Sequence, residues 1–232
     1  MDPRLKNITH VFLDADDTLW ENDIYYRKAE AEFLELMSPY VRGEECAKIL
    51  SYHQELNIKV FGYGSKTYLL GMLDAAAQIV PQEFQPQMYR QIKEIIVRLE
   101  QHPFDFLEGA EETVRALAKK YKVIIATKGE LSEQMRKWRI SKLEDCVSAI
   151  EVMEKKSVKD YLNLAAKIGI DPKDFFMVGN AVRSDVAPVI EMGGWAVHVP
   201  YKITWAHEMM DIPHSDRVFE IKHISELLDI LM

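Results

Sequence analysis

The sequence has few cysteines and no excess of basic residues. Only 2 of its 232 residues are cysteines. Cys46 and Cys146 lie far apart and form no CxxC pair, which excludes a thiolate zinc site and is typical of a reducing compartment. Lys and Arg number 29 against 37 Asp and Glu, so the formal net charge is −8. A chain this acidic lacks the clustered cations that bind phosphate backbones, so we expect no nucleic acid partner.

Long apolar runs are also missing. No stretch approaches the ~20 apolar residues that span a bilayer. Residues 1–7 carry charges where a signal peptide has its apolar run. Because the sequence contains neither feature, we expect a soluble, cytoplasmic protein with no membrane partner.

The composition is that of a globular protein. Hydrophobic residues make up 48% of the chain, charged residues 28% and aromatic residues 10%, which is enough apolar surface for a real core and excludes intrinsic disorder. No repeat or low-complexity segment occurs. The length allows one large domain or two modest ones.

Short apolar runs that end in polar residues recur along the chain. Their length and β-branched content predict strands buried on both faces, at 10–13, 122–126, 175–178 and 195–199, with a weaker candidate at 147–152. Helical periodicity separates these strands, at 108–121, 131–140, 158–169 and 185–192. This alternation predicts an α/β fold, a Rossmann-like, doubly wound parallel sheet.

One long segment interrupts the alternation. Residues 22–101 contain no convincing strand. Apolar periodicity there predicts amphipathic helices at 25–37, 44–59, 65–80 and 86–101. We therefore expect an all-helical, four-helix domain at 22–101, inserted into an α/β core made of residues 1–21 and 102–232.

Asp14 and Asp16 follow the first predicted strand. Positions two apart share a side of an extended chain, and two unpaired carboxylates there would repel each other unless a cation lay between them or one were protonated. Magnesium prefers such oxygen ligands. In isolation, Asp-x-Asp is better explained by a solvated loop; the preceding strand and the matching clusters downstream favour the functional interpretation. A calcium-binding loop is excluded, because its sixth position would be Leu19 and its twelfth Tyr25.

Two further clusters follow predicted strands or precede a predicted helix. The hydroxyl of Thr127, followed by Lys128 and Gly129, could hold an anion, or Thr127 could merely cap a helix. Lys155 and Lys156 precede Ser157, a plausible N-cap, and one of them could neutralise charge on a transferring phosphoryl group. A solvated lysine pair is the alternative.

The last cluster is Gly179-Asn180 followed by Asp185. It comes after a predicted strand, so Asn180 and Asp185 are expected at the binding edge of the sheet. Asp185 could equally be the N-cap of its helix, with Pro188 in the first turn.

In this order the four clusters resemble the motifs of the haloacid dehalogenase (HAD) superfamily of phosphatases and phosphotransferases. Residues 12–19 are similar to its Asp-x-Asp-x-Thr motif, Thr127 to the second motif, and Lys155 or Lys156 to the third. Residues 179–185 are similar to the fourth. The resemblance spans the whole chain, and the helical insertion falls where the family places its cap domain.

The resemblance implies a reaction and a set of roles. Asp14 would attack a phosphoryl group and form an aspartyl-phosphate, while Asp16 would act as general acid and then general base. Mg²⁺ would be bound by Asp14, the backbone carbonyl of Asp16 and the fourth motif. Thr127, with Lys128 and Gly129, and the lysine would hold the phosphoryl group.

The fourth motif departs from the usual Gly-Asp, because Asn180 follows Gly179. We expect Asp185 to supply the acidic metal ligand, with Asn180 binding directly or through water. Lys156 is the preferred lysine, and Lys155 applies if the register differs by one.

The predicted function is a magnesium-dependent phosphatase that acts on a small phosphorylated metabolite, in a monomer or homodimer. A dehalogenase, a phosphomutase or a non-catalytic binding protein of the same fold are the alternatives. Asp16 argues against the dehalogenase, since a halide leaving group needs no proton. His207-Glu208 matches the first half of the zinc-protease motif His-Glu-x-x-His, but Asp211 stands in place of the second histidine, so we expect no zinc site there.

Overall fold

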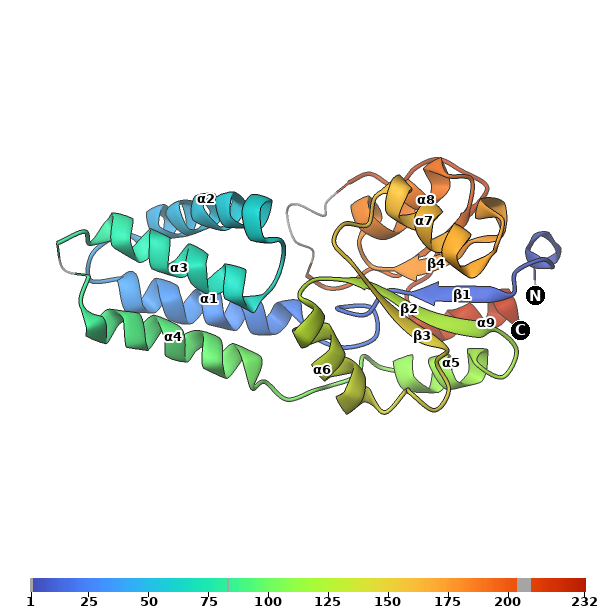
Figure 1. The fold of residues 1–232 in the computed structure, drawn as a ribbon, viewed down its shortest axis with the longest axis horizontal. Helices are drawn as coiled ribbons and strands as arrows, with labels where there is room; N and C mark the ends of the chain where they lie inside the picture. The colour runs from blue at the N-terminus through green and yellow to red at the C-terminus, as the bar shows by residue number, and fades with distance from the viewer. Residues whose placement is uncertain (1, 83, 204–209) are drawn as a thin grey trace. The chain divides into compact units, whose positions relative to one another are not determined.

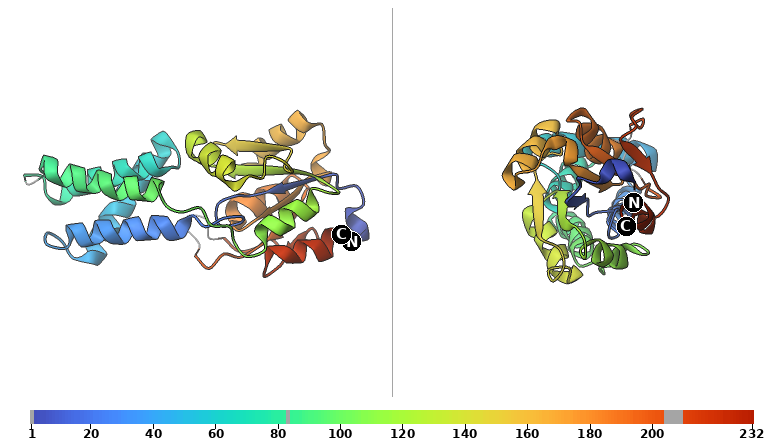
Figure 2. Two further views of the ribbon diagram at one scale, coloured as in Figure 1. Left: turned by 90° about the horizontal axis from the view of Figure 1, so that it is seen from below. Right: turned by 90° about the vertical axis from the view of Figure 1, so that its right-hand side faces the viewer.

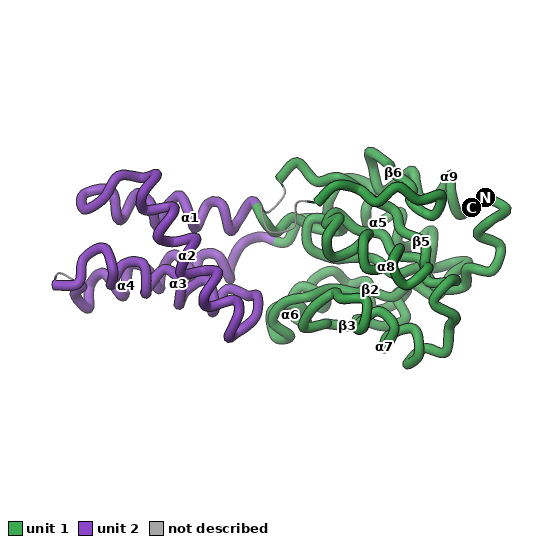
Figure 3. The backbone as a smooth tube through the Cα atoms, turned by 90° about the horizontal axis from the view of Figure 1, so that it is seen from above, with its two compact units in different colours: residues 1–23, 104–232 green, residues 24–103 purple. Residues whose placement is uncertain are grey.

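The computed structural model describes residues 2–82, 84–203 and 210–232; His207 lies outside them. The chain divides into two compact units, one of residues Met1–Asp23 and Phe104–Met232 and the other of Ile24–Pro103 (Figure 3). We call them the α/β unit and the helical unit. The helical unit starts and ends two residues later than the predicted 22–101.

Contacts within each unit explain this boundary. The backbone N–H groups of Asn22 and Asp23 donate to Asp17 in the α/β unit. Phe104 packs against Trp20, with ring centroids 5.2 Å apart. The His102 ring stacks on Tyr25 inside the helical unit.

The α/β unit is built on a six-stranded sheet with the order β3-β2-β1-β4-β5-β6, in which every pairing is parallel. Figure 1 labels the strands β1 to β4. The strands are β1 (His10–Leu13), β2 (Lys122–Lys128), β3 (Ala149–Met153), β4 (Phe176–Gly179), β5 (Trp195–His198) and β6 (Val218–Glu220). This confirms the predicted fold class. The sequence pattern missed β6, an edge strand of three residues that is too short to show a period.

Helices cover both faces of the sheet (Figure 2). Val11 and Leu13 face a core completed by α5 (Ala110–Leu117), α6 (Leu131–Ser141) and α9 (Leu227–Leu231). Phe12, between them, faces the opposite core, formed with α7 (Val158–Ile168) and α8 (Ala187–Glu191). Alternation along a strand buried on both sides explains why the strands read as continuous apolar runs.

The predicted helix at 185–192 is corrected by the structure. A π-helical turn, Val182–Val186, precedes α8, and Asp185 lies inside that turn rather than capping a helix. Pro188 falls in the first turn of α8, where no intrahelical N–H is lost. By contrast, Ser157 does cap α7, through a reciprocal capping box with Asp160.

The helical unit contains α1 (Asp23–Met37) from its second residue on, together with α2 (Gly43–Phe61), α3 (Ser65–Ile79) and α4 (Pro86–Glu100). Its own core is built around side chains such as Phe33, Met72 and Ile92. Among the described residues, no helix has the length and apolar content needed to cross a membrane.

Candidate active site

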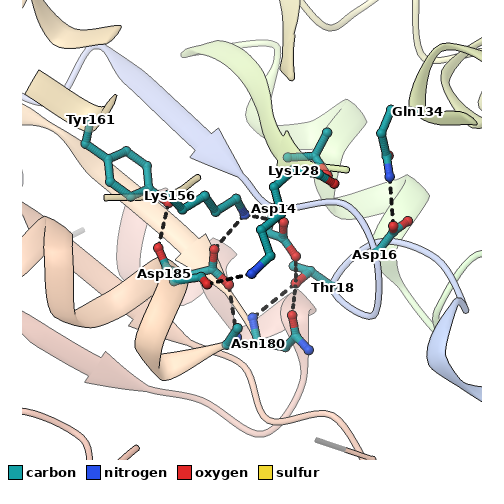
Figure 4. Close-up of polar contacts among 12 residues, drawn as sticks. Asp14, Asp16, Thr18, Lys128, Gln134, Lys156, Tyr161, Asn180 and Asp185 are labelled. Atoms are coloured by element: carbon teal, nitrogen blue, oxygen red, sulfur yellow. Dashed lines mark hydrogen bonds and ion pairs between the residues drawn. The ribbon is translucent and has the colours of Figure 1, made fainter. Parts of the chain in front are cut away.

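The polar clusters that follow β1, β2 and β4 and precede α7 lie together at the carboxyl edge of the sheet (Figure 4). The N–H of Asp14 donates to the carbonyl of Val178 at 2.8 Å, which extends the pairing of β1 with β4 by one residue. Asp14 is thereby fixed beside the loop that carries Asn180 and Asp185. Parallel strands bring these distant segments together because their carboxyl ends share one edge.

Lys156 joins Asp14 to Asp185. Its ammonium donates to Oδ1 of Asp14 and lies 2.7 Å from Oδ1 of Asp185. All three side chains are buried, and we call them the Asp14–Lys156–Asp185 cluster. Lys155 is exposed. Of the two predicted lysines, the structure therefore brings Lys156 to the site.

The charges in this cluster do not balance. Burial raises the pKa of Asp14 to about 7; Lys156 opposes this shift and the Asp185 carboxylate adds to it. For Lys156, burial lowers the pKa, but Asp14 and Asp185 outweigh burial and raise it above its usual value. When both carboxylates are ionised, one ammonium thus faces two buried carboxylates, and the group carries net negative charge.

Thr18 connects the first and fourth motifs. Its hydroxyl lies 3.0 Å from Oδ2 of Asp14 and 3.1 Å from Oδ1 of Asn180, and can donate to either. The same hydroxyl accepts from the N–H of Asn180 at 3.1 Å. The contact orients Asn180 with its amide oxygen toward Thr18.

Close approach to the backbone fixes Asp185. A Cβ on Gly179 would lie 2.2 Å from Oδ2 of Asp185, so no larger residue fits there without moving the carboxylate. The same Oδ2 accepts from the N–H of Ala181 at 2.9 Å. Tyr161 in α7 donates to the carbonyl of Ser184 at 2.9 Å and so holds the π-helical turn from outside. Such turns are frequent at functional sites.

The phosphate-binding candidates lie at the end of β2. The Thr127 side chain is buried there, and the ammonium of Lys128 reaches across to the hydroxyl of Ser184 at 3.0 Å (Figure 4). Gly129 has a φ of +125°, a region that favours glycine. A Cβ on Gly129 would lie 3.2 Å from Nε2 of Gln134.

Asp16 does not share the surroundings of Asp14, contrary to the expectation for positions two apart. The strand ends at Leu13, so the alternation that would place them together stops there. The carboxylate of Asp16 accepts from Trp20 Nε1 at 2.7 Å, Gln134 Nε2 at 2.9 Å and Lys137 Nζ at 3.0 Å. We call these three residues the Asp16 clamp. Burial alone would raise the pKa of Asp16, but Lys137 and the clamp hydrogen bonds lower it below its usual value.

A family model for haloacid dehalogenase-like hydrolases matches residues 8–193. The chain belongs to this family. It is therefore a hydrolase with a HAD-like fold. Among the curated proteins, none matches the chain.

Solved structures of the same family resemble the chain over nearly its whole length. A haloacid dehalogenase-like family hydrolase from Xanthomonas campestris is 32% identical, with a TM-score of 0.87, over 97% of this chain and 91% of that one. The HAD-hydrolase YfnB from Bacillus subtilis, bound to magnesium, is 16% identical with a TM-score of 0.66, over 97% and 99%. A 2-haloacid dehalogenase from Pseudomonas syringae is 20% identical with a TM-score of 0.66, over 97% and 98%.

HAD hydrolases generally use Mg²⁺, and the donor chemistry of this site fits that ion. The side-chain oxygens of Asp14, Asp185 and Asn180 are hard ligands, and the uncompensated negative charge favours a divalent cation. Across residues 2–82, 84–203 and 210–232, no group of three or more His, Cys, Asp or Glu side chains could hold a metal. Two carboxylates would therefore have to be completed by neutral oxygens.

Sequence reasoning missed the residues that support the site. Gln134 and Lys137 carry no motif, and Tyr161 resembled an ordinary core residue of α7. The one available signal was Thr18, the threonine of Asp-x-Asp-x-Thr, whose position in the first motif was recognised but whose contact with Asn180 was not.

Proposed function

We propose that this HAD-like hydrolase is a magnesium-dependent phosphatase, a phosphoric monoester hydrolase that acts on a small phosphorylated metabolite through an aspartyl-phosphate. One observation carries the proposal: two aspartates on a single loop have different environments. Asp14 is buried against Lys156 and Asp185, whereas Asp16 has its own set of donors. Hydrolysis of a phosphate monoester through a covalent intermediate needs a nucleophile and a separate group that acts as acid and then as base.

In the proposed mechanism, a carboxylate oxygen of Asp14 forms a bond to phosphorus as the bond to the leaving oxygen breaks. Asp16 must carry a proton at this step, against the lowering of its pKa by Lys137 and its other donors; it gives that proton to the leaving oxygen, and the alcohol departs. Asp16, now ionised, takes a proton from the water that attacks the aspartyl-phosphate. Phosphate leaves and Asp14 is regenerated. Lys156 and Thr127 hold the transferring group and stabilise its charge.

The charges explain why a metal is needed. A carboxylate and a phosphate dianion ~4 Å apart repel each other by about 2 kcal/mol in water, and by more in a drier site. Mg²⁺ held by Asp14, Asp185, Asn180 and the Asp16 carbonyl would offset this repulsion and polarise the phosphoryl oxygens. We also propose that the helical unit selects the substrate.

A dehalogenase is the main competing function, because a structural relative carries that description. A halide leaves without a proton, so a dehalogenase would have no use for Asp16. The two functions differ in product. The proposed phosphatase releases inorganic phosphate from phosphate monoesters, whereas a dehalogenase releases halide from a 2-haloacid.

The test is turnover of p-nitrophenyl phosphate, followed by phosphate release, with MgCl₂ or with EDTA. We expect turnover that requires Mg²⁺ and falls by about three orders of magnitude or more in Asp14→Asn. Lys156→Met should lose about 10²–10³-fold, and Lys155→Met, the matched control, should retain activity. A panel of phosphorylated metabolites then identifies the substrate. Halide release from a 2-haloacid without phosphate release from any monoester would refute the proposal.

A further inference from the structure

The part of the molecule that the proposed mechanism leaves unexplained is a lysine in the core of the α/β unit. The Lys137 side chain is 0% exposed, and its ammonium lies 3.0 Å from both carboxylate oxygens of Asp16. It also lies 3.0 Å from Oε1 of Glu133 and 2.7 Å from Oδ1 of Asn22. Burying an ammonium is unfavourable unless it is paired, so an apolar residue would serve packing better at this position.

Three residues of α6 belong to the arrangement. Glu133, Gln134 and Lys137 lie within about one turn of the helix, so they share one side of it. Gln134 donates to Oδ2 of Asp16 (Figure 4). Gly129 leaves room for the Gln134 side chain, because a Cβ at position 129 would lie 3.2 Å from Nε2 of Gln134. The helix therefore presents two donors to one carboxylate that is 121 positions away from Lys137 in sequence.

The clamp holds both oxygens of Asp16. Trp20 donates to Oδ1, Gln134 to Oδ2 and Lys137 to both. A carboxylate held by three donors from different directions cannot rotate about its terminal torsion without breaking hydrogen bonds. The Asp16 side chain nevertheless keeps 21% of its surface exposed.

We infer that Lys137, together with Gln134, is a positioning residue that holds the Asp16 carboxyl in the one position and orientation from which it meets the leaving oxygen of the substrate. The inference rests on the proposed function, in which Asp16 transfers the proton. Lys137 touches neither the nucleophile nor the Asp14–Lys156–Asp185 cluster in any contact that the structure gives. Its effect on catalysis therefore passes through Asp16.

The kinetic test compares substrates that differ in their need for a proton. In Lys137→Met, loaded with Mg²⁺, kcat/KM should fall about 10–100-fold for an alkyl phosphate, whose leaving oxygen is strongly basic. For p-nitrophenyl phosphate, whose leaving group departs readily without a proton, kcat/KM should fall less than about 3-fold. Arg139→Met, an exposed position of the same helix, is the matched control. Equal losses on both substrates would mean a structural role and would overturn the inference.

A double-substitution experiment checks that Lys137 acts through Asp16. Once Asp16→Asn has removed the acid, adding Lys137→Met should reduce turnover of the alkyl phosphate no further. Additive losses would contradict the inference. Because Lys137→Met leaves Glu133 without its ammonium, Glu133→Gln/Lys137→Met is the variant to use if the single substitution does not fold.

A crystal structure of the same variant gives a result that does not depend on activity. We expect the Asp16 carboxyl to leave its position beside Gln134 or to occupy two conformers. An unchanged Asp16 overturns the inference whatever the kinetics show. Absence of phosphate release from the wild-type protein would instead refute the proposed function, so the two failures are distinguishable.

Discussion

Asp14→Asn should stabilise the metal-free protein while abolishing turnover. In the folded state burial raises the pKa of Asp14 from its ordinary value of 3.8 to about 7. Each pKa unit is worth about 1.4 kcal/mol, so at pH 8 the ionised Asp14 costs the folded state about 4 kcal/mol at most. The substitution removes this cost. It also keeps the hydrogen bonds, because the amide oxygen can face Lys156 and the amide nitrogen can donate to Thr18.

The sign of the pH dependence follows from the direction of the shift. A carboxyl whose pKa is raised on folding contributes stability that is complete below about pH 4 and is lost as the pH rises toward 7. The gain from Asp14→Asn should therefore be largest near pH 8, about 1–4 kcal/mol, and should shrink as the pH is lowered toward 4.

The assay is urea unfolding in EDTA at pH 5 and pH 8, with Lys156→Met as the opposite perturbation. Removing Lys156 leaves two buried carboxylates without their cation and should cost about 3–5 kcal/mol. A destabilised Asp14→Asn at pH 8, or a gain that does not depend on pH, would refute the reasoning that excess negative charge is buried at this site.

Three further outcomes follow from the same geometry. Mg²⁺ at about 100 times its Kd should raise the stability of the wild-type protein by about 2.7 kcal/mol, and that of Asp14→Asn by much less, in thermal unfolding. Gly179→Ala should displace the Asp185 carboxylate and lower the free energy of unfolding by about 2–4 kcal/mol. It should also weaken Mg²⁺ binding measured by calorimetry, and an unchanged affinity would contradict this. Burial, reinforced by Asp16, raises the pKa of Asp17 to about 8, so wild-type stability should fall from pH 5 to pH 8 by up to about 1.4 kcal/mol per pH unit from this residue. Asp17→Asn should remove this contribution to the pH dependence of the unfolding free energy, measured by urea titration. If the free energies of the variant and the wild type ran parallel from pH 5 to pH 8, the prediction would be wrong.

The α/β core was largely predictable because its strands are buried on both faces. Such strands appear as short apolar runs whatever they pair with, and their polar ends mark the functional edge. The segment 10–13 was predicted with the bounds of β1, and the four helices of the insertion were recovered from their periodicity. The edge strand β6 was missed because three residues carry no period.

The candidate site was predictable in part. Asp14, Lys156, Asn180 and Asp185 lie in motifs whose spacing is local, and the structure brings them together. The surroundings of Asp16 were not predictable, because its partner Lys137 belongs to a helical pattern in which a lysine indicates an exposed face. The π-helical turn at Val182–Val186 was also missed; its contacts with Tyr161 and Lys156 come from another segment of the chain and leave no local pattern.

The sequence by itself determined the fold class, the helical insertion and the identity of the residues at the functional edge. Burial pattern and motif spacing can both be recognised in the local sequence. Only the tertiary structure decided which charges neighbour one another: that Lys156 bridges Asp14 and Asp185, and that Lys137 holds Asp16. Electrostatic environments depend on distances between segments more than a hundred residues apart, and no local pattern encodes those distances.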